Sequence, residues 1–287
     1  MQPLDDLLPA NTTIVVLDTS PARNLGYADD PPSWVETFVN MTNSGYSFSL
    51  ADNAFAELLS QMTSHAMGVE QAARMLKLLK AFLNPDLPIL PGKSDLYALI
   101  GSNERASDWS VDQVRSLSID AWNVLNRSSS ATGGRLSSVE NELQSEREAW
   151  FAFFENLGKR DTTGEPLNEC EHSQLTIALT SSDSKVPELS PPLSVHWDLQ
   201  IRLLWRQYVR SNRTSRPYDP TSLKNRNDGI DFDLFHYFLL PAFVVATDRG
   251  FFEKLSDIKS YQKAWFWKPE SLAKAWANGE RPRAIWP

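Results

Sequence analysis

Residues 227–255 read NDGIDFDLFHYFLLPAFVVATDRGFFEKL and contain the clearest strand of the second half of the chain. Residues 244–247, VVAT, form an apolar, β-branched run that is typical of a buried strand. Asp248 follows this run directly, and residues just beyond the carboxyl end of a strand line the ligand crevice of open α/β sheets. Asp248 is therefore a candidate site residue. Three further acids crowd the start of the apolar helix that precedes the strand, namely Asp228, Asp231 and Asp233.

A second acidic region is predicted near the start of the chain. Residues 13–17, TIVVL, form a continuous β-branched run, which indicates a central parallel strand buried on both faces. Asp18 follows this strand directly. Residues 45–50, GYSFSL, predict a second strand, and the helix after it carries Glu57. Because the carboxyl ends of parallel strands lie at one edge of a sheet, we expect these acids to meet there.

The rest of the chain has mainly helical patterns. Amphipathic spacing predicts helices at residues 34–41, 51–62, 69–83, 110–125, 136–157, 195–210 and 269–278. Residues 261–267 fit either a helix or a strand, and residues 88–91 fit a short strand. Strands at both ends of the chain must form one sheet. The pattern therefore predicts an α/β protein, an α/β/α sandwich with a central, mainly parallel sheet and a long helical insertion.

The expected division of the chain follows from this order. We place the first part of the α/β domain at residues 1–63 and the helical insertion at residues 64–225. The second part of the domain is expected at residues 226–268, and a C-terminal helix and tail at residues 269–287. Within the insertion, residues 158–192 are polar and irregular.

The charge, the cysteine count and the apolar runs of the chain exclude or disfavour several classes of protein and of metal site. The 287 residues carry a net charge of -8, which disfavours a passive nucleic-acid binder but is compatible with acids that hold a metal. Cys170 is the only cysteine, which excludes an intramolecular disulfide and a cysteine zinc site. The first residues include acids where a signal peptide needs positive charge, and no apolar run reaches membrane-spanning length. We therefore expect a cytoplasmic protein.

Four acids from four distant places in the sequence are expected to converge, namely Asp18, Glu57, Asp233 and Asp248. Clustered carboxylates repel each other, and without a cation some of them would take up protons. A hard divalent cation with oxygen ligands, Mg²⁺ or Mn²⁺, removes this repulsion. Such a site suits hydrolysis of a phosphodiester, in which the metal activates water and stabilises the leaving oxygen.

The motifs that carry these acids resemble those of the PIN-domain family. The pieces are VVLDTS at residues 15–20, FAELL at 55–59, DLFHYFLLPAFVVATD at 233–248 and RGFF at 249–252. The first motif of the family is a strand followed by Asp-Thr-Asn. Asp18 and Thr19 match it, and Ser20 stands where Asn is usual.

The other three motifs have matching positions in the same order. The second motif is a Glu on the helix after the second strand, which Glu57 matches. The third is an Asp that opens a helix, often as Asp-x-x-His, matched by Asp233 and His236. The fourth is a strand that ends in Thr-Asp, matched by Thr247 and Asp248.

The resemblance implies a metal-dependent endoribonuclease. It implies that Asp18, Glu57, Asp233 and Asp248 ligate Mg²⁺ or Mn²⁺ and that the substrate is RNA. Many PIN-like toxins of toxin–antitoxin pairs are inhibited by an antitoxin, so an antitoxin-like partner and a homodimer are expected candidates; no membrane partner is expected. The family is shorter than this chain and does not explain residues 64–225.

The other two acids at the start of residues 227–255 have structural interpretations. Asp228 and Asp231 are rivals to Asp233 as the third acid. Asp231 precedes the apolar helix and is expected to cap it. Asp228 lies in Asn-Asp-Gly and is expected to form a turn. His236 shares a helix face with Asp233, where it could contact phosphate or be a hydrogen-bonded core residue.

Several residues are candidates for substrate contacts. They are Thr19, Ser20, His236, Thr247, Arg249 and Arg226. Arg226 ends a basic run interleaved with aromatic residues, a composition suited to single-stranded RNA. The basic members are Arg202, Arg206, Arg210, Arg213, Arg216, Lys224 and Arg226. The run also fits a solvated surface that offsets nearby acids.

Two other functions remain compatible with the sequence. Ser20 in place of Asn, together with the long insertion, fits a PIN-like binding module for protein or RNA without catalysis. A mainly helical scaffold would instead leave the four acids scattered. The distance between Asp18 and Asp248 in the fold separates these hypotheses.

Overall fold

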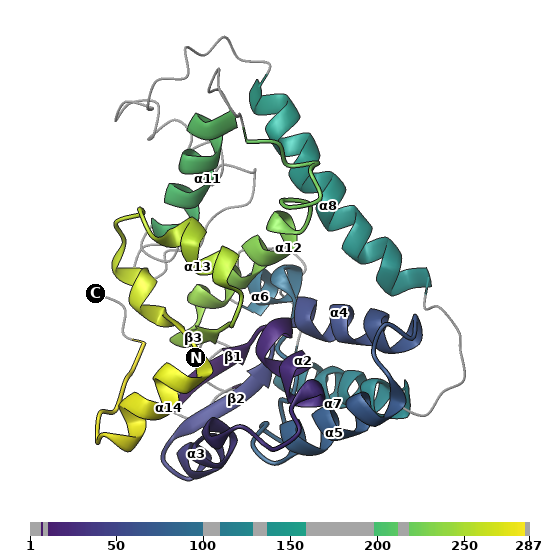
Figure 1. Cartoon of the computed structure of the whole chain (residues 1–287), viewed down its shortest axis with the longest axis vertical. Coiled ribbons are helices and arrows are strands. Elements are labelled where there is room, and N and C mark those ends of the chain that lie inside the picture. Colours follow the sequence, from purple (N-terminus) through teal and green to yellow (C-terminus); the bar gives the residue numbers. More distant parts are fainter. Residues whose placement is uncertain are drawn as a thin grey trace.

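A four-stranded, all-parallel sheet forms the centre of the computed structural model (Figure 1). The structure describes residues 7, 11–99, 110–128, 137–158, 198–211 and 218–284. The strands are β1 (Thr13–Leu17), β2 (Tyr46–Leu50), β3 (Ala242–Val245) and β4 (Phe266–Trp267), in the spatial order β2-β1-β3-β4. The fold is therefore α/β, consistent with an α/β/α sandwich.

Strand β1 lies between two partners that come from opposite ends of the chain. Leu17 pairs with Leu50 of β2 on one side and with Val245 of β3 on the other. All five residues of β1 are buried, as the β-branched run predicted. The register places the carboxyl ends of β1, β2 and β3 at one level, which brings the residues that follow them to the same edge.

Strand β2 is also buried on both faces, although its sequence alternates between apolar and serine residues. The serines are accommodated by hydrogen bonds: Ser49 Oγ donates to Leu87 O at 2.6 Å, and Asn84 Nδ2 donates to Ser47 Oγ at 2.8 Å. Isolated parallel bridges join Phe48 to Leu83 and Leu50 to Ile89. The short strand predicted near residues 88–91 is thus a single bridge at the outer edge of β2.

One helix next to the sheet was not indicated by the sequence pattern. Helix α2 (Thr19–Tyr27) begins directly after Asp18, and its first turn contains Pro21. Proline is tolerated in the first turn, because its missing N–H has no intrahelical partner there. Asp18 caps the helix by accepting the Ser20 N–H at 3.4 Å.

The remaining helices near the sheet follow the predicted apolar stripes. They are α3 (Ser33–Thr42), α4 (Asp52–Thr63), α5 (Val69–Lys80) and α14 (Pro269–Ala277). Helix α2 packs against α4 and α5, and α3 packs against α14. Below β2, Phe38, Phe48 and Phe82 form edge-to-face and stacked pairs with centroids 4.6–5.7 Å apart. Residues from 67 to 96 belong to the same hydrophobic core as the strands.

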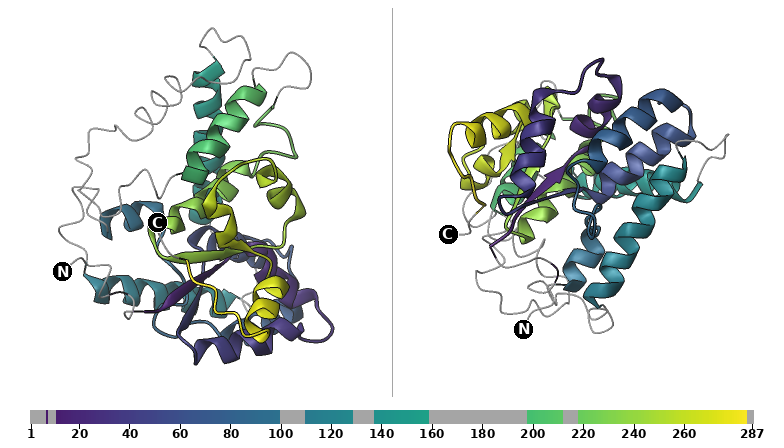
Figure 2. Two further views of the ribbon diagram at one scale, coloured as in Figure 1. Left: turned by 90° about the vertical axis from the view of Figure 1, so that its left-hand side faces the viewer. Right: turned by 90° about the horizontal axis from the view of Figure 1, so that it is seen from below.

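Four further helices come from the middle of the chain. They are α6 (Lys93–Leu99), α7 (Val111–Ser128), α8 (Ser137–Gly158) and α11 (Asp198–Ser211). Leu96 of α6 and Val114 and Leu125 of α7 belong to the core around the strands, whereas α8 and α11 extend away from the sheet. Figure 2 shows α8 and α11 side by side above the sheet, and their contact is aromatic. Trp150 and Phe154 of α8 pack with Leu204 and Tyr218. The irregular region predicted at residues 158–192 lies almost entirely outside the described residues.

Residues 227–255 form four short elements. Helix α12 (Asp228–Asp233) continues into the 3₁₀ helix η2 (Leu234–Leu239), and α13 (Arg249–Leu255) follows β3. The ambiguous residues 261–267 form both a 3₁₀ helix, η3 (Tyr261–Trp265), and strand β4. No helix in the described part of the chain is long and apolar enough to cross a membrane.

Candidate functional site

Asp18 lies at the carboxyl end of the central strand. Its backbone N–H donates to Val245 O at 3.0 Å, so the ladder with β3 reaches one residue past β1. Its carboxylate accepts the Ser20 hydroxyl at 2.7 Å. Burial raises the pKa of Asp18, hydrogen bonds from Ser20 and Thr19 oppose that rise, and the charge of Asp248 adds to it. Asp18 and Asp248 therefore lie at the same edge of the sheet, as predicted.

Ser20 joins the two strand ends. Its Oγ donates to Asp18 Oδ2 and accepts the backbone N–H of Thr247 at 3.0 Å. Thr247 Oγ1 in turn accepts Asn24 Nδ2 at 3.2 Å. Ser20 was predicted as a substrate contact, but both of its described bonds are internal, and they fix the Asp18 carboxylate relative to β3.

Replacing Ser20 with Ala should lower the free energy of unfolding by roughly 1–2 kcal/mol, because two hydrogen bonds are lost and the Thr247 N–H is left without its acceptor. Urea unfolding of the purified variant measures this change. Ser44→Ala is a matched control, since the Ser44 hydroxyl is exposed and bonds only weakly, at 3.4 Å, to Asn40 O. Equal midpoints for Ser20→Ala and Ser44→Ala would contradict the structural role of Ser20.

Glu57 lies on α4 and faces the start of α2. Its Oε2 accepts a hydrogen bond from the Thr19 hydroxyl, which is buried. Burial raises the pKa of Glu57; the bond from Thr19 opposes this, and the charge of Asp18 adds to it. Arg147 and Arg23 act in the opposite direction, since positive charge favours the carboxylate. Glu57 thus belongs to the same electrostatic group as Asp18, as predicted.

Asp231 is the third acid of this group. Burial, opposed by Lys254, together with the charges of Asp18, Asp228 and Glu57, raises the pKa of Asp231 to about 7. Asp231 is not the N-cap that the sequence predicted, because α12 begins one turn earlier and the Asp231 N–H donates to Asn227 O at 2.9 Å.

Asp233 lies elsewhere. Its Oδ1 is 3.4 Å from Lys93 Nζ, and Lys93 also pairs with Glu146 of α8. Burial raises the pKa of Asp233, Lys93 opposes that rise, and Glu146 and Asp52 add to it. These residues line a cavity of about 280 Å³ between α4, α6, α8 and η2. Asp233 therefore lies at this cavity, and Asp231, the alternative third acid, is the one on which the charges of Asp18 and Glu57 act.

His236 accompanies Asp233 and not the acidic group. The ring is buried, with Nδ1 3.1 Å from Asp233 O and Nε2 3.5 Å from Gln200 Nε2. Burial lowers the pKa of His236 to about 4, so the ring is neutral at neutral pH. Of its two predicted roles, the hydrogen-bonded core residue agrees with this environment.

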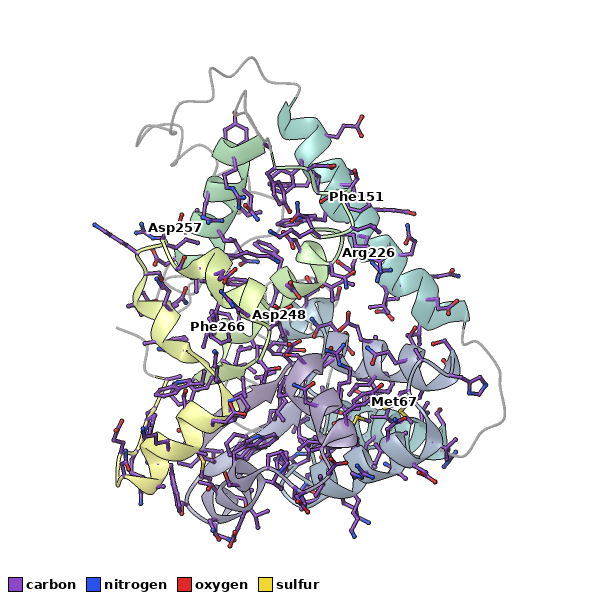
Figure 3. The ribbon with its side chains drawn as sticks, viewed as in Figure 1. Met67, Phe151, Arg226, Asp248, Asp257 and Phe266 are labelled. Atoms are coloured by element: carbon purple, nitrogen blue, oxygen red, sulfur yellow. The ribbon has the colours of Figure 1, made fainter. Side chains whose placement is uncertain are left out.

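Asp248 is the exposed member at the edge of the group. It caps α13, with Oδ1 accepting the Gly250 N–H at 2.6 Å and the Phe251 N–H at 3.4 Å. Arg249 next to it is exposed and pairs with Glu253 at 2.6 Å. Figure 3 shows Asp248 near the centre of the molecule, where α13 begins.

Lys254 is a part of this region that the sequence analysis missed, together with its pairing to Asp228. Lys254 Nζ lies 2.5 Å from Asp228 Oδ1 and 3.3 Å from Asp231 Oδ2. Asp228, which was predicted to form a turn, is the first residue of α12; it is 5% exposed and also accepts the Tyr218 hydroxyl at 2.8 Å. The signal that could have found the pair is Lys254 on the buried side of α13, between Phe251 and Leu255.

The donor chemistry of Asp18, Glu57, Asp231 and Asp248 fits a hard divalent cation, because all four offer carboxylate oxygens and three have raised pKa values. Among the described residues, no three His, Cys, Asp or Glu side chains are grouped closely enough to hold a metal ion. Cation binding would therefore require some of these side chains to move, and Asp231 would have to leave Lys254.

Comparison of the chain with models of known protein families, with curated proteins and with solved structures yields no match. The candidate site consequently rests on its geometry and on the motifs in the sequence. Of the predicted basic run, Arg202, Arg206, Arg210, Lys224 and Arg226 are described, whereas Arg213 and Arg216 lie outside the described residues.

Proposed function

We propose that this protein is a PIN-like, Mg²⁺- or Mn²⁺-dependent endoribonuclease. The observation that carries the proposal is the convergence of four acids from distant segments at one edge of a parallel sheet. Asp18 and Asp248 follow adjacent strands, and the charges of Asp18 and Glu57 both act on Asp231. Ligands of open α/β sheets bind at this edge.

Asp18, Glu57, Asp231 and Asp248 would hold the cation, and Thr19 and Ser20 fix the orientation of two of these carboxylates. A bound cation would activate water and neutralise charge on the phosphodiester. Arg147 and Arg23 supply positive charge to Glu57, and the charge of Arg226 acts on Arg147, which favours an anionic substrate there.

Incubation of the purified protein with single-stranded RNA and Mn²⁺ should produce internal cleavage, and excess chelator should stop it. Asp248→Asn should lower the rate by on the order of 10², as removal of one electrostatic group does in other active sites. Asp30→Asn is the control, because it makes the same chemical change at an exposed acid in the turn between α2 and α3, outside the group of four. Equal rates for Asp248→Asn and the unaltered protein, with an unchanged circular-dichroism spectrum, would refute the assignment.

A PIN-like binding module without catalysis is the alternative, and one observation favours it. Lys254 already supplies a positive charge to Asp231, as a metal would. Calorimetric titration with Mn²⁺ separates the two functions, since the module predicts no heat of binding at millimolar Mn²⁺ and the nuclease predicts saturable binding.

A further inference from the structure

Helix α8 comes from the part of the chain that the resemblance leaves unexplained, yet it is seated on both α4 and α12. Leu143 of α8 packs with Ala56 of α4 and Ile230 of α12. About two turns further on, Trp150 approaches the backbone of α12 so closely that a Cβ on Gly229 would lie 2.7 Å from Trp150 Cβ. These two contacts fix the rotation of α8 about its axis.

Arg147 lies between those two contacts along α8, one turn after Leu143 and about one turn before Trp150, so it shares their side of the helix. Its Nε donates to Asn227 Oδ1 at 3.1 Å, at the start of α12. Arg147 is half-buried, and its charge acts on Glu57 of the acidic group. The packing of α8 on α4 and α12 therefore places the guanidinium group of Arg147 on the side of the edge where the acids converge.

A second guanidinium group lies next to it. Arg226 is exposed and precedes α12, on the side that faces α8 (Figure 3). Burial lowers the pKa of Arg147, and the positive charge of Arg226 lowers it further, while Glu57 opposes both. Within the described part of the chain, neither arginine forms an ion pair, and the two amino groups of Arg147 have no acceptor.

Two like charges held together, one of them partly desolvated, are unfavourable unless an anion joins them. A guanidinium group presents a planar fork of donors that matches the oxygens of a phosphate. We propose that Arg147 and Arg226 form a phosphate clamp that binds the backbone of single-stranded RNA next to the acidic site. The proposal rests on the proposed function for its substrate, and it gives α8 a role in holding that substrate.

Fluorescence anisotropy of a labelled single-stranded RNA oligonucleotide tests the clamp in the presence of chelator, so that binding is measured without cleavage. Arg147→Gln and Arg226→Gln should each weaken binding roughly tenfold, because each removes charge-assisted hydrogen bonds. Each should also reduce the slope of log affinity against log salt by about 0.7, the value for one phosphate contact on a single strand. Arg147→Lys should keep the slope and bind with intermediate affinity, since it keeps the charge and loses the fork.

Arg74→Gln is the matched control, because it removes the same charge from α5, where exposed Arg74 lies outside the basic run and donates to Ala28 O at 2.7 Å. It should bind as the unaltered protein does. The clamp is refuted if Arg147→Gln and Arg226→Gln bind RNA with the affinity and salt slope of Arg74→Gln. Because Arg226 is exposed, Arg226→Gln should fold normally, and it tests the clamp even if Arg147→Gln does not fold.

The outcome is separable from that of the nuclease proposal. Loss of RNA binding in Arg147→Gln, with no Mn²⁺-dependent cleavage by the unaltered protein, would support the clamp and refute the nuclease. The opposite result would be cleavage that depends on Asp248, together with an Arg147→Gln variant that binds and cleaves RNA as well as the unaltered protein does. That result would support the nuclease and refute the clamp.

Discussion

Replacing Asp231 with Asn should lower the rate of Mn²⁺-dependent RNA cleavage by on the order of 10³, whereas Asp233→Asn should leave the rate within about tenfold. The two residues are only two positions apart, but their surroundings differ. The charges of Asp18 and Glu57 act on Asp231, while Asp233 faces Lys93 and Glu146. If the four-acid group is the active site, only the first substitution removes one of its members.

The same substitution should stabilise the fold at high pH. The pKa of Asp231 is about 7 in the folded protein, above the value near 3.9 of an unfolded chain. The folded state therefore binds the proton more tightly, and stability from this group is lost as pH rises from about 4 to 7. Asn cannot ionise, so in chelator Asp231→Asn should gain on the order of 1–3 kcal/mol over the unaltered protein at pH 8, after allowance for solvent and for Lys254.

Rates of cleavage at saturating Mn²⁺ and urea unfolding at pH 5 and pH 8 measure both effects. Asp233→Asn is the control for the rate, since it makes the same chemical change at the neighbouring acid. A large loss of rate in Asp233→Asn with little change in Asp231→Asn would restore the assignment made from the sequence alone.

The strands and the acids that follow them were predictable, because a fully buried parallel strand has a simple sequence pattern. Residues 13–17 and the acid Asp18 are an example: the continuous β-branched run indicated burial on both faces, and all five residues are buried. The strand before Asp248 was predicted at residues 244–247 and lies at Ala242–Val245, so Asp248 follows its end by three positions, where it caps α13. Glu57 followed from the amphipathic stripe of α4, which places it beside buried Ala56 and Leu58.

The third acid could not be assigned from the sequence because its direction depends on where a short helix begins. Side chains two positions apart in an α-helix diverge by about 200°, so Asp231 and Asp233 point to nearly opposite sides. The sequence favours a start at Asp231, whereas Asn227 is the N-cap and α12 begins at Asp228. The position of α12 is fixed by the contact between its Gly229 and Trp150 of α8, two residues that are far apart in the chain. Periodicity within one segment carries no information about such a contact.

Lys254→Met should lower the free energy of unfolding by roughly 3–5 kcal/mol, the range observed when one partner of a buried ion pair is removed. Lys254 Nζ lies 2.5 Å from Asp228 Oδ1, and Asp228 is 5% exposed. Burial acts to lower the pKa of Lys254, but Asp231 and Asp228 outweigh it and raise that pKa. Without the ammonium group, two carboxylates would remain in a poorly solvated position with no counter-ion.

Most of this loss should be recovered when the charge of Asp228 is removed as well. Asn at position 228 keeps an oxygen that can accept the Tyr218 hydroxyl, so the chain of hydrogen bonds from Trp150 Nε1 through Tyr218 is retained. Urea unfolding of Lys254→Met, Asp228→Asn and the double variant gives the coupling energy of the pair, for which contacting residues typically show about 0.5–3 kcal/mol. Lys259→Met, an exposed lysine, is the control and should change stability by less than about 0.5 kcal/mol. Strictly additive effects in the double variant would mean that the Lys254–Asp228 pair does not stabilise the junction between α12 and α13, and that Asp231 is held in the acidic group by packing alone.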